Sequence, residues 1–496
     1  MQLTIDLNCP ITFHCLTNIS METNQSLSVV VDQVLQQSVT AFHQYRQFPS
    51  ARRAEFLLQI REQILALGDE LINTASAETN LTTARLINER GRTLLQLQQM
   101  ADMLHKNDWQ EVIQHIPPVD NPTAHPDIRR MLFPLGPVVV FGSSNFPFAY
   151  STAGGDTASA LAAGCTVVVK AHPAHLKTSC MVASAVQLAA TASGMPSNVF
   201  QHLEEGSFEA GKLLVQHSLT AAVGFTGSFS GGKALWDYAA ARPSPIPVFA
   251  EMGSINPVLI FPDYLKTEHS KLAEMYAGSI TLGVGQFCTN PGLLIATEGE
   301  GLNEFIEQLS SRLNAISPGA MLHEGISKSY QNNSSKLLNI KSVNSVTSNK
   351  NLDSNHCAYP ILATVHADIF LQEPVLKEEV FGPFSLLVIC RNEQEMLQVL
   401  HTVQGQLTVS MMATENDFVH HPDFIQAAIP VAGRLIHNGV PTGVEVCEAM
   451  VHGGPFPATT DSRFTAVGTQ SVKRWLRPVA FQNFPENWLP KELQKG

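Results

Sequence analysis

One cysteine stands in a setting that suggests reactivity. Cys288 lies in GQFCTN, between a glycine and polar residues, whereas Cys165 precedes a run of valines. We expect the loop thiol to be the more exposed and the more easily activated of the two, and the thiolate is the nucleophilic form of cysteine. A lone cysteine is most often a small core residue, so this segment alone leaves both interpretations open.

Two further side chains could support nucleophilic chemistry. Glu251 lies in the apolar segment PVFAEMGS, where burial would raise its pKa and allow it to accept a proton near neutrality. An ionised glutamate paired with a lysine or arginine is an equally good interpretation. Asn145, in FGSSNFPF, could donate an amide N–H to a developing oxyanion, or it could be a turn asparagine before Pro147.

A glycine-rich turn could hold a phosphate group. In AVGFTGSFSGG, Gly227 and Ser228 stand where a strand-like run gives way to a helical one. Backbone N–H groups at a helix start can bind a pyrophosphate, and Gly227 has no side chain to obstruct it. The segment is neither G-x-G-x-x-G nor a Walker A loop, so an ordinary turn is the more frequent explanation.

Lys170 ends the strand-like run CTVVVK. Ligands of open α/β sheets bind beyond the carboxyl ends of the strands, so this lysine could bind the ribose of a nucleotide; a solvated lysine is the alternative. Residues 171–178 contain no carboxylate and offer His172, His175 and Lys177 instead. That composition favours tolerance of a 2′-phosphate.

The surrounding pattern predicts the elements that would position these residues. Residues 25–106 carry apolar residues at threes and fours, which indicates helices, and residues 107–130 suit a protruding strand pair. Apolar runs then alternate with helical stretches, which is typical of βαβ units with a buried parallel sheet. A second α/β region is predicted over residues 248–438. Within it, the Ser/Asn-rich segment 329–357 is predicted to be mainly surface loop and short edge elements.

Composition excludes several classes of function. The chain has 496 residues, enough for two or three domains, and 44% hydrophobic with 15% charged residues is usual for a soluble globular protein. A net charge of −12 without a basic run argues against nucleic acid. We see neither an apolar stretch that could cross a membrane nor a secretory signal, and expect a cytoplasmic protein. Eight scattered cysteines without zinc-site spacing predict reduced thiols and no metal.

Five segments occur in the order and at the spacing of a known family: FTGS, FAEMGSINPV, GQFCTNPG, EEVFGPF and NFP. From about residue 30 to 482 the chain resembles the aldehyde dehydrogenase superfamily. KAHPAH and VHGGPFPATTDSRFTAVGTQSVKRWLRPVAFQ look most like the branch of 2-oxoglutarate semialdehyde (2,5-dioxopentanoate) dehydrogenases and NADP-dependent fatty aldehyde dehydrogenases. Residues 1–24 do not resemble the usual opening strands of the family.

The resemblance implies a catalytic role for four residues. Cys288 would add to the aldehyde carbonyl, and Asn145 together with the Cys288 backbone N–H would hold the oxyanion. Glu251 would activate the water that hydrolyses the thioester, a step that acylating relatives replace by attack of coenzyme A. His452, in VHGGP, matches a branch-specific histidine that would assist proton movement.

The resemblance also implies a nicotinamide cofactor, with NADP preferred and NAD possible. Lys170 would bind the adenosine ribose, Gly227 and Ser228 the pyrophosphate, and Glu379 the nicotinamide ribose, with Phe381 beside it in EEVFGPF. A dicarboxylic semialdehyde needs a cation for its distal carboxylate, for which Arg463 is the candidate, although Arg463 could equally satisfy a loop. A fatty aldehyde would need an apolar tunnel instead.

The fold implied by the resemblance is α/β with two open parallel-sheet domains and a small strand flap. A Rossmann-like nucleotide-binding domain would comprise residues 1–106 and 134–247, a catalytic domain residues 248–438, and an oligomerisation flap residues 107–133 and 460–490. The flap implies a homodimer or homotetramer. Two other functions stay open: a thioester hydrolase or acylating dehydrogenase, and a catalytically silent protein on the same scaffold.

Overall fold

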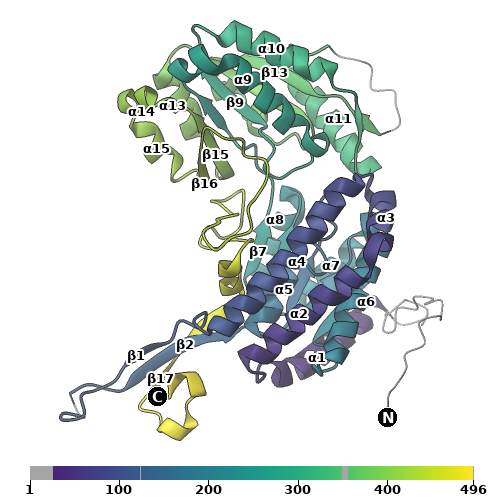
Figure 1. The fold of residues 1–496 in the computed structure, drawn as a ribbon, viewed down its shortest axis with the longest axis vertical. Coiled ribbons are helices and arrows are strands. Elements are labelled where there is room, and N and C mark those ends of the chain that lie inside the picture. Colours follow the sequence, from purple (N-terminus) through teal and green to yellow (C-terminus); the bar gives the residue numbers. More distant parts are fainter. Residues whose placement is uncertain (1–25, 123, 349–355, 495–496) are drawn as a thin grey trace.

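The computed structural model describes residues 26–122, 124–348 and 356–494. Two lobes of helices and strands carry a slender strand extension, and both lobes contain a largely parallel sheet (Figure 1). The α/β architecture predicted from the sequence is therefore confirmed. Residues 1–24, which were expected to depart from the opening strands of the family, lie outside the described residues.

From residue 26 onward, four helices precede the first described strand, as the apolar periodicity predicts: α1 (Leu27–Tyr45), α2 (Ser50–Ala66), α3 (Gly68–Thr79) and α4 (Thr83–Lys106). The longest of them, α4, begins at Thr82, whose hydroxyl accepts a hydrogen bond from Arg85 N. It ends at Asn107 in the left-handed conformation. No helix in the described part of the chain has both the length and the apolarity that a bilayer-spanning segment needs.

The first sheet has five parallel strands in the order β5-β4-β3-β6-β7. Its strands are β3 (Val138–Phe141), β4 (Val167–Lys170), β5 (Phe200–Leu203), β6 (Ala222–Thr226) and β7 (Val248–Glu251). Between them run α5 (Gly155–Ala163), η1 (Pro173–His175), α6 (Leu176–Ala192), α7 (Phe208–Gln216) and α8 (Phe229–Ala240). The valine-rich strands are buried because helices cover both faces.

Strand register aligns the ends of this sheet. Phe141 pairs with Lys170 on one side and with Phe225 on the other, and Thr226 pairs with Glu251. The carboxyl ends of four strands therefore meet at one edge. The residues predicted to bind ligands lie at or just beyond these strand ends. They are therefore all located at the same edge of the sheet.

The expected domain boundary at residue 248 differs from the observed strand pairing. The strand β7, which begins at Val248, pairs with β6 and belongs to the first sheet; the second sheet begins only at β8 (Val258–Ile260). The apolar run of β7 predicts a strand, but hydrogen bonding to a partner distant in sequence decides which sheet it joins.

The second sheet has seven strands in the order β11-β13-β14-β9-β8-β15-β16, all parallel except β11. Its other strands are β9 (Leu293–Thr297), β11 (Asn344–Ser345), β13 (Ile361–His366), β14 (Phe384–Cys390), β15 (Gln406–Met412) and β16 (Ala432–His437). The helical elements of this lobe are α9 (Pro262–Thr281), η2 (Leu282–Gly285), α10 (Leu302–Ala315), α11 (Glu324–Leu338), α12 (Ala367–Gln372), η3 (Pro374–Lys377), α13 (Glu393–Thr402), α14 (Glu415–His420) and α15 (Asp423–Ala428). A two-stranded ladder joins β10 (Gly319–Ala320) to β12 (Cys357–Ala358).

The prediction of mainly loop for residues 329–357 is wrong over its first part, where α11 continues to Leu338. Tyr330, Ser334 and Leu337 are buried at helical spacing on one face. The many polar residues occupy the other face. Because polar residues outnumber the few buried ones, the composition of this segment predicts a loop where a helix forms.

The extension is an antiparallel sheet of β1 (Ile113–His115), β2 (Ile128–Pro134) and β17 (Leu476–Gln482), as Figure 1 shows. Two short 3₁₀ turns accompany it, η5 (Glu486–Trp488) and η6 (Lys491–Leu493), whereas η4 (Thr469–Trp475) packs against α5 in the first lobe. The predicted strand pair after residue 107 is confirmed, and the chain's tail supplies the third strand. The buried side chain of Arg129, on β2, forms ion pairs with Asp127 and with Glu486 of η5 and so connects β2 to the C-terminal segment.

Candidate active site

Three side chains from distant segments meet in the structure, and we name them the Cys288 cluster: Cys288, Glu251 and His452. Glu251 ends β7, Cys288 lies between η2 and β9, and His452 lies in the irregular segment after β16. Their potential ligand atoms all lie within 4.8 Å of one another. His452 Nε2 is 3.6 Å from Cys288 Sγ and 3.0 Å from Glu251 Oε1, which places an imidazole in contact with both a thiol and a carboxylate.

The charge of Glu251 reflects its neighbours more than its burial. Burial acts to raise the pKa of this carboxyl, but His452, the Cys288 thiol and Arg92 outweigh it and hold the pKa below its ordinary value. The prediction that burial would raise the pKa is therefore wrong. The direction of this shift agrees with the alternative of an ionised glutamate, but the side chain in contact with it is a histidine rather than a lysine or arginine.

Cys288 rests as a protonated thiol. Burial raises the pKa of the thiol well above its usual value, the ionised Glu251 raises it further, and Arg92 only partly opposes the shift. The residue is more exposed than Cys165, as predicted, and its activation depends on a neighbouring base rather than on a low resting pKa. Any reaction at Cys288 therefore needs a proton acceptor, and Glu251 and His452 are in contact with it.

The loop that carries the cysteine has a shape that few residue types allow. Gly285 adopts a φ of +64°, and a Cβ there would lie 2.3 Å from the carbonyl carbon of Gly382. Asn256 Nδ2 donates to Cys288 O at 2.8 Å and to Asn290 O at 2.9 Å. Asn256 thus fixes the backbone of the cysteine and of the residues that follow it. It lies inside the quoted segment GSINPV, and sequence reasoning assigned it no role.

Asn145 reaches the same loop. Its side-chain Nδ2 donates to Gln286 O at 3.2 Å, and its carbonyl oxygen accepts a hydrogen bond of 2.6 Å from Arg85 Nη2. The side chain is buried. The structure therefore brings the predicted oxyanion donor next to the cysteine loop, with an arginine that holds its backbone.

The predicted nucleotide-binding residues lie along the carboxyl edge of the first sheet. Lys170 is buried at the end of β4; burial lowers the pKa of its ammonium, and Glu205 only partly opposes this shift. Gly227 N donates to Glu251 O at 3.0 Å. Ser228 caps α8, where its hydroxyl accepts from Gly231 N at 3.2 Å. The buried ammonium of Lys170 and the N-terminus of α8 therefore both lie at this edge of the sheet.

Glu379 joins the two lobes near the cysteine. Its Oε1 accepts from Ser254 N at 3.3 Å, and a Cβ on Gly253 would lie 2.5 Å from its Oε2. Burial raises the pKa of this carboxyl to about 7, against the opposing effect of the Ser254 N–H. Phe381, two residues further on, is half-buried. The carboxylate is thus packed beside the segment that follows Glu251.

Arg463 is not brought to the Cys288 cluster by any contact in the described part of the chain. Its side chain is 78% exposed and makes a two-pronged ion pair with Asp461. Arg92 lies closer to the chemistry, since it affects the pKa of both Cys288 and Glu251. Sequence reasoning missed it, although Arg85, Glu89 and Arg92 repeat at helical spacing on the buried face of α4, where charged residues are unusual.

Comparison with known proteins identifies the family. The aldehyde dehydrogenase family model matches residues 2–454. The chain is 47% identical to alpha-ketoglutaric semialdehyde dehydrogenase 2 of Azospirillum brasilense, covering 92% of this chain and 87% of that protein. It is 42% identical to the alpha-ketoglutaric semialdehyde dehydrogenase of Acinetobacter baylyi, covering 94% and 89%.

Solved structures show the same fold at low sequence identity. A 3,6-anhydro-L-galactose dehydrogenase in complex with NAP superposes with a TM-score of 0.76 at 20% identity, covering 92% of each chain. A Staphylococcus aureus betaine aldehyde dehydrogenase with NAD+ superposes with a TM-score of 0.78 at 16% identity, covering 93% of this chain and 91% of that one. From the family match and the arrangement of its residues, this chain belongs to the aldehyde dehydrogenase family and is an enzyme that oxidises aldehydes.

Proposed function

We propose that the enzyme oxidises 2-oxoglutarate semialdehyde to 2-oxoglutarate, with Cys288 as nucleophile and NADP as the preferred cofactor. Two relatives that align over nearly the whole chain carry this activity in their names. The observation that carries the mechanism is the contact of thiol, imidazole and carboxylate in the Cys288 cluster. When bound, a nicotinamide dinucleotide supplies the two-electron acceptor that aldehyde oxidation requires.

The first chemical step joins the Cys288 sulfur to the aldehyde carbon. Because the resting thiol is protonated, its proton passes to Glu251, directly or through His452, as the carbon–sulfur bond forms. The carbonyl oxygen becomes an oxyanion, which Asn145 Nδ2 and the Cys288 backbone N–H hold by hydrogen bonds. Donors of this kind contribute about 10²–10³ in rate at comparable sites.

The last step releases the product as a free acid. Once the aldehyde carbon is oxidised to a thioester on Cys288 and the proton from the first step has passed from Glu251 to solvent, the carboxylate takes a proton from water, and the resulting hydroxide attacks the thioester carbonyl. The thiolate leaves and regains a proton from the same pair, since His452 lies 3.0 Å from the carboxylate. An acylating enzyme would not need this base, so Glu251 favours hydrolysis.

The first sheet offers a fitting cradle for the cofactor. The buried ammonium of Lys170 has only partial compensation from Glu205, and the start of α8 adds backbone N–H groups beyond Gly227. We assign the adenosine ribose to Lys170, the pyrophosphate to Gly227 and Ser228, and the nicotinamide ribose to Glu379, with Phe381 beside it. Residues 171–178 contain no carboxylate. This absence favours NADP; a much higher kcat/KM with NAD would overturn that preference.

A cationic wall near the cysteine suits a substrate with a distal carboxylate. Arg85 Nη1 and Arg434 Nε are buried and lack hydrogen-bond partners within the described part of the chain. Burial lowers the pKa of both guanidinium groups, and a Cys288 thiolate, once formed, would oppose the shift in each. Unsatisfied guanidinium donors match carboxylate oxygens. Arg463, exposed and paired with Asp461, is the weaker candidate.

The substrate assignment can be tested by comparing kcat/KM for 2-oxoglutarate semialdehyde with that for decanal. We expect the semialdehyde to be preferred, and Arg434→Gln to raise its KM at least tenfold with little effect on decanal, because the positive charge and the unpaired Nε–H donor are lost. Arg463→Gln is the matched control. Preference for decanal would instead support a fatty aldehyde dehydrogenase.

We further propose that the first sheet with α1–α8 binds the nucleotide, the second sheet forms the catalytic domain, and the strand extension mediates assembly into a homodimer or homotetramer. Val112, Ile113 and Val119 are exposed apolar residues on or beside the extension, and both β1 and β17 are edge strands that another chain can pair with. Light scattering after size exclusion measures the mass directly. A monomer at micromolar concentration would contradict this proposal.

A further inference from the structure

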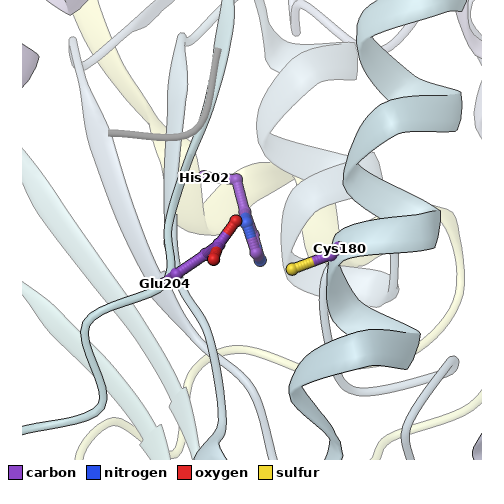
Figure 2. A group of neighbouring side chains, drawn as sticks. All are labelled: Cys180, His202 and Glu204. Carbon is purple, nitrogen blue, oxygen red and sulfur yellow. The ribbon is translucent and has the colours of Figure 1, made fainter. Parts of the chain in front are cut away.

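A second group of the same residue types lies away from the proposed active site, and we name it the Cys180 cluster: Cys180, His202 and Glu204. Cys180 lies on α6, His202 on β5, and Glu204 directly after β5. The three side chains point toward one another (Figure 2), and their potential ligand atoms lie within 4.8 Å of one another. None of them belongs to the proposed catalytic or cofactor machinery.

His202 is held in an orientation that suits a metal ligand. The residue is 3% exposed, and its Nε2 lies 2.7 Å from Ser179 Oγ, which in turn lies 2.6 Å from Thr152 Oγ1. Its Nδ1 is buried without a hydrogen-bond partner among the described residues. When Nε2–H donates to the serine, Nδ1 keeps a lone pair for a metal, and this outer hydrogen bond is the usual companion of a metal-bound histidine.

A second buried polar atom without a partner lies in the same cluster. Glu204 Oε1 is also buried and lacks a hydrogen-bond partner within the described residues. A buried carboxylate oxygen without a donor is unfavourable, and a cation between the three side chains would satisfy both orphan atoms.

We propose that Cys180, His202 and Glu204 bind a divalent transition metal, with Zn²⁺ as the best match. One sulfur, one imidazole nitrogen and one carboxylate oxygen form a donor set that suits tetrahedral zinc, and three protein ligands leave a fourth position for water. Zinc bonds of about 2.0–2.3 Å require the donors to approach to roughly 3.3–3.8 Å from one another. Binding therefore requires a small inward rotation of Cys180 and Glu204, the two partly buried members of the cluster.

The metal would join α6 to the end of β5. Leu203 pairs with Lys170 of the neighbouring strand β4, so Glu204 follows directly beyond the strand position opposite the proposed ribose-binding lysine. Binding of an ion to the folded state alone stabilises that state. We therefore expect Zn²⁺ to raise the melting temperature of the enzyme without any need for substrate.

The test uses Co²⁺ as a spectroscopic probe on full-length, tag-free protein carrying Cys288→Ser, which removes the thiol of the other cluster. We expect about one Co²⁺ per chain, a near-ultraviolet thiolate-to-cobalt absorption band, and displacement by Zn²⁺. Adding Cys180→Ser should abolish the band and weaken binding at least tenfold. Glu204→Gln should keep the band but weaken binding at least tenfold, while Cys447→Ser, at another partly buried cysteine, should change neither.

Two results would overturn the proposal. The first is the absence of a thiolate band from the Cys288→Ser protein, and the second is a band that survives Cys180→Ser. The Glu204→Gln variant removes only a charge at a partly exposed position, so it remains informative if substitutions at buried His202 prevent folding. None of these readouts uses catalysis, so the metal site can fail while the proposed function stands, and the converse also holds.

Discussion

The chain places a cysteine, a histidine and a glutamate in contact at two different locations, the Cys288 cluster and the Cys180 cluster. In the first, the imidazole lies 3.0 Å from the carboxylate, and arginines of α4 and β16 act on the thiol. In the second, the imidazole is hydrogen-bonded to a serine, and burial is the cause that lowers its pKa. The same three residue types therefore suit proton transfer in one place and metal binding in the other, because their surroundings differ.

Removing each thiol should separate the two clusters most strongly. We expect Cys288→Ala to lower aldehyde oxidation by about 10⁴-fold or more, since no other group can form the covalent intermediate. Cys180→Ala should lower it by less than about tenfold, through stability alone. Steady-state reduction of NADP with 2-oxoglutarate semialdehyde measures both effects. Full activity of the Cys288→Ala enzyme would rule out the mechanism.

Neutralising the carboxylate of the Cys288 cluster should have the next largest effect. Glu251→Gln keeps the volume but removes the base, so kcat should fall by about 10²–10³-fold. Mass spectrometry during turnover should then find the acyl group retained on Cys288. Glu448→Gln, at an exposed position that accepts a hydrogen bond from Gln470, serves as the control. An unchanged kcat for Glu251→Gln would remove this residue from the mechanism.

The histidine of the Cys180 cluster should make the unfolding free energy of the enzyme depend on pH. Burial depresses the pKa of His202 from 6.5 to about 4, so between these values the unfolded chain binds a proton that the folded chain does not. The metal-free enzyme should therefore lose up to about 3 kcal/mol of unfolding free energy as the pH falls across that window. Urea denaturation of wild type and His202→Gln at several pH values measures this. If the unfolding free energy depends on pH equally in both proteins, the low pKa of His202 is not its cause and the prediction fails.

The smallest expected effect concerns the histidine of the Cys288 cluster. His452 holds the pKa of Glu251 down, so in His452→Gln burial should dominate and leave that carboxyl protonated to a higher pH. The acidic limb of the kcat profile should move upward, with a loss of about tenfold near neutrality that recovers as the pH rises. A profile that keeps its position while kcat falls uniformly would mean that His452 acts only on packing.

Local patterns predicted the elements well, and the resemblance to a family predicted the roles. The valine runs that end at Phe141 and Lys170 are strands, and because parallel strands share an edge, residues beyond their ends were expected to lie together. The glycine turn at Gly227 does precede a helix. These features depend on neighbours in sequence, so periodicity and turn chemistry are sufficient to predict them.

Tertiary structure alone decided the features that depend on distant neighbours. It paired β7 with the first sheet, and it set the charge of Glu251 through His452 and Arg92, which are remote in the chain. It also assembled Cys180, His202 and Glu204 from a helix and a strand end, a grouping without any spacing signal in the sequence. The sequence by itself determined which chemical groups are available and which strand ends carry them. Packing determined which groups touch, and contact sets their protonation and therefore their chemistry.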